Sequence, residues 1–230
     1  MSHVGRHFDL RVGDRPLRIV VVGQESGWPK ARGTAKFGRK VSLETRYHAV
    51  HDRSGHERRY YAQGDYPGRN PHMRGTTSAL RVIFGKGLGS DHGGEFIRPT
   101  NGRAFHIFDG FALVNRLLCS AGPKGSSEGH PTKTMFRNCE EHFRATMSIL
   151  QPTLVIVQGG RVDRQTRGVF ERTRSYTENL HVARFEEQRV LVCTFSHPSA
   201  RGSLRWGDSL ASPYLNEVVV PTLKKAVRRL

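Results

Sequence analysis

The stretch LRIVVVG, residues 17–23, decides the fold of this chain of 230 residues. It is an almost unbroken run of β-branched and leucine side chains that ends at a glycine. Similar apolar runs occupy residues 154–157 (LVIV) and 190–195 (VLVCTF), and residues 105–114 contain a fourth. Because these runs lack a polar face, they are typical of strands covered on both sides, as in a parallel sheet.

Helical patterns lie between the predicted strands. One covers residues 76–84, and residues 134–150 repeat apolar side chains at helical spacing. A last helix begins at Ser212-Pro213, an N-cap followed by proline at the first helical position, and we expect a kink at Pro221. Strands that alternate with helices predict an α/β fold, here a three-layer α/β/α arrangement around a central, mostly parallel four-stranded sheet.

The whole chain, residues 1–230, is expected to form one domain. Residues 28–70 stand apart because they are polar, glycine-dotted and basic, with ten Lys or Arg against four Asp or Glu. We interpret this segment as a basic insertion within the domain.

The charge balance indicates a polyanionic partner. The chain has 37 Lys and Arg against 20 Asp and Glu, which gives a formal net charge of +17. Such an excess raises the local concentration of nucleic acid and steers it toward the protein. No apolar run approaches the ~18 residues of a membrane span, and the N-terminus lacks the apolar core of a signal peptide. We therefore expect a cytoplasmic, nucleoid-associated protein of a prokaryote without membrane contact.

Three cysteines, Cys119, Cys139 and Cys193, are widely spaced and form no C-x-x-C pair. This pattern provides neither a disulfide framework nor a four-cysteine zinc site, and it fits a reducing compartment. The 12 histidines are scattered without H-E-x-x-H spacing. We expect no metal and no cofactor.

Polar motifs follow three of the predicted strands. They are GQESG at residues 23–27, Asn115, and SHPS at residues 196–199. Ligands of parallel sheets bind at the carboxyl ends of the strands, so the three motifs should converge on one crevice. Each is weak alone, because glycine turns, a buried Asn and a histidine after a strand are common structural features.

The motifs together resemble the uracil-DNA glycosylase superfamily. VVVGQESG (residues 20–27), FALVNRLLC (111–119) and TFSHPSARGSLRW (194–206) are similar, in order and spacing, to its three motif segments. PHMRG (71–75) and the segments between residues 131 and 156 look like its iron–sulfur branch. The resemblance covers nearly the whole chain except the insertion.

The resemblance implies a monofunctional DNA glycosylase, an enzyme that flips out a pyrimidine and hydrolyses its N-glycosidic bond to leave an abasic site. Glu25 would orient the attacking water and stabilise the cationic sugar, and His197 would donate a hydrogen bond to the oxygen of the leaving base. The implied partner is single- or double-stranded DNA, bound by a monomer.

Further residues are implied as contacts of the base and of the DNA. Gln24 and Asn115 would bind the base, and His72 stands where the family has a stacking Phe, with Tyr60, Tyr61 and Tyr66 as rivals for stacking. Arg201 or Leu204 would fill the gap left by the flipped base. The expected DNA-binding residues are Ser199, Arg201, Leu204, Arg205, Arg74 and Thr76.

Departures from the family bear on cofactor and substrate. The first ten residues lack the N-terminal cysteines of the iron–sulfur branch, so we expect no cluster and predict that Cys119 and Cys139 pack as small apolar side chains. Gly27 stands in place of the tyrosine that blocks carbon 5 of the pyrimidine. Two substrates stay open: uracil (or mismatched thymine), and a hydroxymethylated or glucosylated cytosine of phage DNA, which would make the protein a defence enzyme.

Two other functions compete with this interpretation. A non-catalytic DNA-binding member of the superfamily would need neither Glu25 nor His197. A serine hydrolase is suggested by Ser26, but the local pattern is G-x-x-S-G rather than the G-x-S-x-G nucleophile elbow, and the positive charge would have no role.

Overall fold

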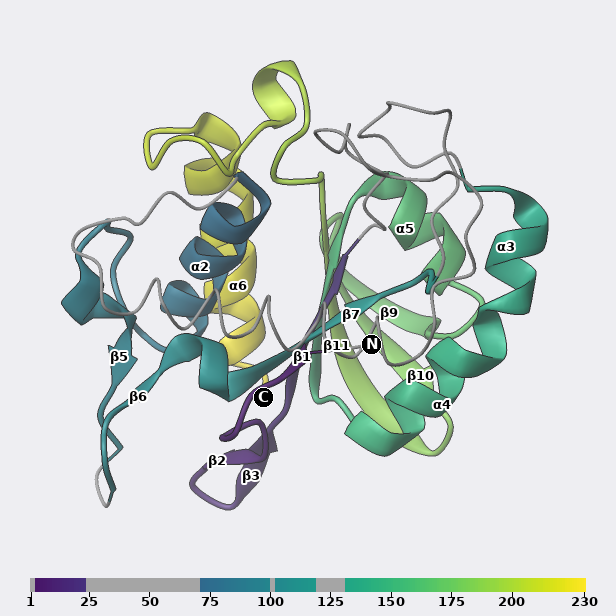
Figure 1. Ribbon diagram of the computed structural model, residues 1–230, viewed down its shortest axis with the longest axis horizontal. Coiled ribbons are helices and arrows are strands. Elements are labelled where there is room, and N and C mark those ends of the chain that lie inside the picture. Colours follow the sequence, from purple (N-terminus) through teal and green to yellow (C-terminus); the bar gives the residue numbers. More distant parts are fainter. Residues whose placement is uncertain (1–2, 24–70, 100–101, 119–130) are drawn as a thin grey trace, which may run out of the picture.

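The computed structural model describes residues 3–23, 71–99, 102–118 and 131–230 (Figure 1). The strands are β1 (His3–Val4), β2 (Leu10–Val12), β3 (Arg15–Leu17), β4 (Ile19–Gly23), β5 (Phe96–Ile97), β6 (Phe105–His106), β7 (Phe111–Asn115), β8 (Leu154–Gln158), β9 (Glu171–Thr177), β10 (Leu180–Phe185) and β11 (Gln188–Phe195). The helices are α2 (Pro71–Ile83), α3 (Lys133–Asn138), α4 (Glu140–Leu150), α5 (Gly160–Thr166), the π-helix Leu215–Val219, α6 (Val220–Val227) and the 3-10 helices His92–Glu95, Ile107–Gly110 and Gly202–Leu204.

Several predicted features lie outside the described residues. These are the insertion at residues 28–70, which includes Tyr60, Tyr61 and Tyr66, and Gln24, Glu25, Ser26, Gly27 and Cys119. None of the described helices is both long and apolar enough to cross a bilayer.

A sheet of seven strands, in the order β1-β7-β4-β8-β11-β10-β9, forms the centre of the molecule. The four neighbours β7, β4, β8 and β11 run parallel, whereas β1, β10 and β9 pair antiparallel with their neighbours. The α/β class is therefore confirmed, but the expectation of a mostly parallel four-stranded sheet is wrong in strand number, because the sheet is larger and mixed.

Helices cover both faces of this sheet, as expected for three layers. Ile19 and Val21 of β4 join the core that contains α2 and α6, and Val20 and Val22 join the core that contains α4 and α5. All four side chains are fully buried. Figure 1 shows α2 and α6 on one side of the strands and α3, α4 and α5 on the other. Successive side chains of a strand point to opposite faces, so an unbroken apolar run is what such a central strand requires.

The hairpin β9–β10 was not predicted from the sequence. β9 reads ERTRSYT and forms the mostly exposed edge of the sheet, so it carries no apolar run. Charged side chains on an edge strand also discourage pairing with other chains. β10 is almost entirely buried, but Arg184 interrupts its apolar pattern.

Two helices differ from their predicted bounds. α2 begins at Pro71, five residues before the predicted start, because proline is well suited to the first turn of a helix. The helix predicted over residues 134–150 is two helices, α3 and α4, which are separated at Cys139. Cys139 has φ −91° and ψ −2°, and the Thr132 side chain caps α3 by accepting from the amide of Met135.

The last helix begins as predicted. The Ser212 hydroxyl accepts from the amide of Leu215 at 3.4 Å, as an N-cap does. Where we expected a kink at Pro221, the structure has the π-helix Leu215–Val219 just before the proline. Since Pro221 has no N–H to donate and its ring crowds the preceding turn, the helix widens there.

Candidate functional site

The described residues of three predicted motifs lie at the carboxyl ends of the parallel strands. Gly23, the last residue of β4, lies beside Asn115, the last residue of β7, in the parallel register. Gln158, at the end of β8, lies beside Phe195 of β11, and the SHPS segment follows directly. The structure therefore brings Gly23, Asn115 and the SHPS segment to one edge of the sheet.

His197 is held in one tautomer. Its Nδ1 accepts a hydrogen bond from the Ser199 amide at 3.2 Å, and its carbonyl accepts from the Ala200 amide at 2.8 Å. Burial lowers the pKa of His197, so the neutral ring dominates at pH 7. With Nδ1 acting as an acceptor, the proton of the neutral ring is on Nε2. His197 can therefore donate from Nε2 without being charged.

His72 lies against His197 at the start of α2. The two rings are stacked, with centroids 5.3 Å apart and an interplanar angle of 17°. Burial, and secondarily the nearby His197, lower the pKa of His72 from its ordinary value of 6.5 to about 4, and the neighbouring Gln158 side chain opposes this shift. The buried Nε2 of His72 has no partner within hydrogen-bond distance.

Gly23 leaves a small space between two polar atoms. A Cβ added there would lie 3.2 Å from Asn115 Oδ1 and 3.5 Å from His72 Nε2. An amide oxygen and an imidazole nitrogen thus face the same point, and a polar ligand atom near it could contact both. Asn115 and His72 are therefore close enough together to form hydrogen bonds with the same ligand.

Gln158 is a site residue that sequence reasoning missed. Its side chain is fully buried, and its Nε2 donates to the Thr76 hydroxyl at 3.2 Å. Its Oε1 has no hydrogen-bond partner. The signal in the sequence was a glutamine that ends an otherwise apolar strand, LVIVQ. Buried polar atoms are nearly always paired, so two unpaired ones in a single cluster indicate a place for a ligand.

The SHPS segment is fixed from several directions. The Ser196 hydroxyl donates to the Leu204 carbonyl at 2.6 Å, and the Ser196 amide donates to the Tyr214 hydroxyl at 3.1 Å. Trp206, which is fully buried, donates from Nε1 to the Ser196 carbonyl at 2.8 Å. These bonds hold His197 on a rigid support.

Gly75 allows α2 to approach this segment closely, which gives a testable prediction. A Cβ at Gly75 would lie 2.7 Å from Pro198 Cβ and 3.0 Å from the Trp206 ring. Alanine normally stabilises a helix by about 1 kcal/mol relative to glycine. We expect Gly75→Ala to destabilise the protein instead, by about 1–3 kcal/mol in chemical denaturation, because the overpacking outweighs the helix propensity.

Gly87→Ala is the matched control, since a Cβ at Gly87 would meet nothing within 4 Å. Its free energy of unfolding should stay close to that of the parent. A Gly75→Ala protein that is as stable as this control would show that α2 and the SHPS segment are not tightly packed.

The expected DNA-binding residues have different surroundings. Ser199, Arg201 and Leu204 are exposed on the loop that follows β11, and the Leu204 side chain is 51% exposed. Arg205 forms an ion pair with Asp208, and Arg74 donates to the Asp208 carbonyl at 3.3 Å. A shallow hollow of about 330 Å³ lies beside this loop, lined in part by Arg205. These five residues are available at the surface or near it.

Thr76 is the exception and corrects the prediction. Its side chain has no exposed surface, and its hydroxyl accepts from Gln158. A DNA phosphate cannot reach it. Because α2 begins at Pro71, Thr76 lies on the buried side of the second helical turn, where it supports Gln158 instead.

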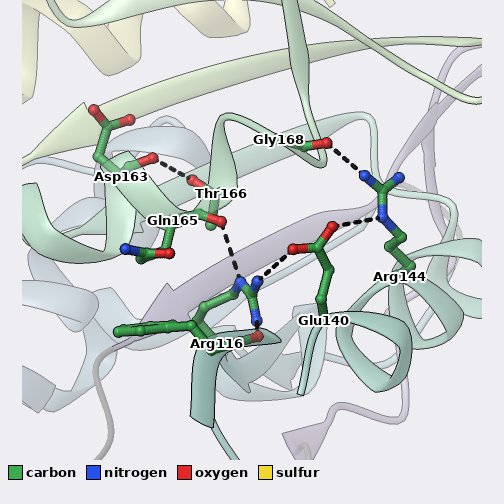
Figure 2. Close-up of polar contacts among 8 residues, drawn as sticks. Arg116, Glu140, Arg144, Asp163, Gln165, Thr166 and Gly168 are labelled. Carbon is green, nitrogen blue, oxygen red and sulfur yellow. Dashed lines mark hydrogen bonds and ion pairs between the residues drawn. The ribbon is translucent and has the colours of Figure 1, made fainter. Parts of the chain in front are cut away.

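Arg116 anchors the strand end that carries Asn115 (Figure 2). Its guanidinium is buried and donates to the Gln165 carbonyl, the Phe136 carbonyl and the Glu140 carboxylate, each at 3.3 Å. Glu140 also accepts from Arg144, at 3.2 Å. The network therefore ties β7 to α3, α4 and α5 on one face of the sheet.

The depressed pKa of His72 predicts a loss of stability in acid. The unfolded chain takes up a proton near pH 6.5, but the folded protein does so only near pH 4. The stabilising contribution is therefore present above about pH 6.5 and is lost as the pH falls toward 4, with a total change of about 3 kcal/mol. In His72→Phe, the free energy of unfolding should depend less on pH between about 6.5 and 4 than it does in the parent protein. Urea denaturation at several pH values measures this dependence.

The exposed His142 provides the control for this measurement. His142→Phe should keep the acid dependence of the parent. If His72→Phe keeps it as well, the acid sensitivity comes from other groups and the buried neutral state of His72 is wrong.

Cys139 packs as predicted, in a small cluster with Leu117 and Phe136. In the described ranges, no group of three or more His, Cys, Asp or Glu side chains gathers where it could hold a metal ion. No protein-family model and no curated protein matches the chain. A function for it therefore rests on the geometry of this site and on the sequence motifs.

Proposed function

We propose that this protein is a monofunctional DNA glycosylase with a uracil-DNA glycosylase-like fold, which flips a pyrimidine out of DNA and hydrolyses its N-glycosidic bond. One observation carries the proposal: His197, whose Nδ1 accepts a hydrogen bond from the Ser199 amide, follows β11 at the same end of the parallel strands as Asn115 and Gly23. Base excision needs a hydrogen-bond donor for the leaving base and an amide that recognises the edge of the base.

The reaction divides into two tasks. The bond between the base nitrogen and the sugar carbon breaks, its electron pair goes to the base, and a water oxygen bonds to the sugar carbon. His197 Nε2–H donates to the base oxygen on which negative charge grows. Glu25, two residues beyond Gly23 in the sequence, accepts the proton of the attacking water and stabilises the positive sugar.

A neutral donor suits this leaving group. An imidazole that donates from Nε2 stabilises an oxyanion without first losing a proton, and the lowered pKa of His197 keeps it in this form. Preorganisation by the Ser199 amide avoids a reorientation cost during the reaction.

The fold likeness is part of the proposal. Among the four adjacent parallel strands β7, β4, β8 and β11, three carry motif residues at their carboxyl ends: Gly23 ends β4, Asn115 ends β7, and the SHPS segment follows β11. The wider sheet and the basic insertion at residues 28–70 would then be additions to a common core.

The candidate base-binding residues do not distinguish among the pyrimidines. The Asn115 amide can present a donor or an acceptor, so it fits the edge of uracil or of cytosine. Gly27, where a tyrosine would exclude groups at carbon 5, keeps both uracil and enlarged cytosines open as substrates. The surface arginines and Leu204 would hold the phosphates and fill the emptied position in the stack.

The experiment is a cleavage assay on matched DNA that contains uracil, hydroxymethylcytosine or glucosylated hydroxymethylcytosine, followed by alkali to reveal abasic sites. We expect cleavage of at least one substrate by the parent protein and an altered base preference for Asn115→Asp. Cleavage of uracil DNA alone indicates repair, and cleavage of the enlarged cytosines alone indicates defence against phage. Tight, salt-sensitive binding without any cleavage would instead mean a non-catalytic DNA-binding protein.

A further inference from the structure

Three polar side chains, Thr76, Gln158 and His72, gather beside the strand ends of the candidate site. His72 and Thr76 are four residues apart on α2, so they lie on the same face of the helix, one turn apart. Gln158, at the end of β8, donates from Nε2 to the Thr76 hydroxyl at 3.2 Å. Thr76 and Gln158 are fully buried, so they can act on a ligand only through His72.

The bond with Thr76 fixes the orientation of the Gln158 amide. Its Nε2 is engaged with Thr76, so its oxygen, Oε1, is the atom left for another partner. The Gln158 side chain raises the pKa of His72 against the larger, opposite effect of burial, as an acceptor beside an imidazole does. Oε1 is therefore the atom of Gln158 that faces the His72 ring.

This group of side chains has too few hydrogens for its acceptors. The pKa of His72, lowered mainly by burial to about 4, keeps the ring neutral at pH 7, and a neutral ring has one N–H. Gln158 Oε1 and the nearby Asn115 Oδ1 can only accept hydrogen bonds. Among the described residues, the buried Gln158 Oε1 and His72 Nε2 have no hydrogen-bond partner. One N–H is thus available for two amide oxygens, and at least one of them needs a hydrogen from elsewhere.

We propose that Gln158 takes the N–H of His72 and thereby makes the site selective for a base with an amino group at carbon 4, that is, for the cytosine class. A buried acceptor without a partner is costly, whereas Asn115 is exposed and can bind water or a ligand. The ring hydrogen therefore goes to Gln158 Oε1. This inference rests on the proposed function, because it takes the ligand to be a pyrimidine flipped out of DNA.

The ligand then meets acceptors beside Gly23. The position of a Cβ at Gly23 is 3.2 Å from Asn115 Oδ1 and 3.5 Å from His72 Nε2, and neither atom offers it a hydrogen. The amino group of cytosine supplies two hydrogens to such a place, whereas the oxygen at the same carbon of uracil supplies none. Cytosine and its derivatives at carbon 5 share the amino group, so the group at carbon 5 is selected by other residues.

Asn115 alone would not make this choice. Its amide can turn to present either its oxygen or its nitrogen, which fits both classes of pyrimidine. The Gln158 amide cannot turn in the same way without losing the bond from its Nε2 to Thr76. Gln158 is therefore a positioning residue that acts through His72, and the preference depends on Thr76 as well.

The test compares hydroxymethylcytosine with hydroxymethyluracil, two bases that share the group at carbon 5 and differ on the edge around carbon 4. Each is placed in duplex DNA opposite an abasic analogue, so that neither base has to break a pair. Base release is followed in single turnovers, and affinity is measured with 2′-fluorinated nucleotides, which resist hydrolysis. The variants are Gln158→Met and Thr76→Val, and Gln165→Met on α5 is the control for the loss of a glutamine amide.

We expect the parent to prefer hydroxymethylcytosine by at least about tenfold in both rate and affinity, because a site that hydrogen-bonds an amino group rejects an analogue without it. Gln158→Met and Thr76→Val should each reduce this ratio to about threefold or less, and Gln165→Met should keep the parent ratio. A purely structural defect lowers the values for both bases and leaves their ratio unchanged.

An equal or reversed preference in the parent would overturn the proposal, and so would a Gln158→Met protein that keeps the parent ratio. Release of both bases at equal rates would support excision and contradict the selectivity. No release of either base, with the Gln158-dependent ratio still present in the affinities, would contradict the excision step and support the selectivity.

Discussion

Replacing His197 with alanine is expected to lower the rate of base excision about 100- to 1,000-fold, with little change in DNA affinity. The reason is the loss of the Nε2–H donor where negative charge develops, since the ring is fixed by the Ser199 amide and carries no charge of its own. The measurement is a single-turnover time course on the substrate that the parent cleaves best, with enzyme in excess over DNA.

Ser199→Ala is the matched control for this prediction. It removes an exposed hydroxyl but keeps the backbone N–H that fixes His197, so the excision step should remain fast while DNA binding weakens. If His197→Ala excises as fast as the parent protein, His197 is not the group that stabilises the leaving base.

Replacing Arg116 with methionine is expected to lower the free energy of unfolding by about 3–5 kcal/mol. The guanidinium is 1% exposed and donates to three acceptors on three other elements (Figure 2), so its removal leaves buried acceptors unpaired. Methionine keeps much of the volume between the Phe136 and Phe143 rings, which lie 5.7 and 5.2 Å from the guanidinium carbon. Urea denaturation at pH 7 measures the effect.

Arg144→Met tests whether the network or the charge matters. Arg144 also binds Glu140, but it is 44% exposed, and exposed ion pairs contribute only about 0–1 kcal/mol. We expect this variant to lose less than about 1 kcal/mol. If both variants lost the same free energy of unfolding, the buried hydrogen bonds of Arg116 would contribute no more to stability than the exposed ion pair of Arg144.

The central strands could be predicted from the sequence because burial on both faces leaves an unmistakable pattern. Residues 17–23 and residues 154–157 contain few polar side chains, and no other element type of that length requires this. The same logic missed β9, since an exposed edge strand is selected for charge rather than for apolar side chains. It missed the buried β10 because Arg184 interrupts the apolar run of that strand.

Residues of the candidate site could be predicted where a polar motif directly follows a buried strand. Asn115 and His197 were proposed as site residues because ligands gather at the carboxyl ends of parallel strands, and the structure places both at those ends. Gln158 was missed because a single polar residue at the end of a strand is common and predicts no function. Its membership of the candidate site is evident only from the structure, in which Gln158 Nε2 donates to Thr76 and Gln158 Oε1 is buried without a partner. Thr76 itself was misassigned because its burial depends on where α2 begins, and helix boundaries are the least certain part of a sequence prediction.

The identity of the reactive carboxylate remains a prediction from the motif. Glu25 lies outside the described residues, but it follows Gly23, whose position beside Asn115 is established. Glu25→Gln should slow excision without weakening DNA binding, as measured by the same single-turnover assay with a parallel binding titration. A fully active Glu25→Gln protein would remove the water-orienting role from this residue.

The most direct test of the account is the detection of free base released from DNA, by mass spectrometry of the small-molecule fraction. The parent protein and His197→Ala would be incubated in parallel with the same uracil-containing and modified-cytosine DNA. The account predicts that the parent releases one free pyrimidine for each abasic site formed, and that His197→Ala releases almost none in the same time. Intact DNA with no free base, under conditions in which the parent protein is saturated with DNA, would contradict it.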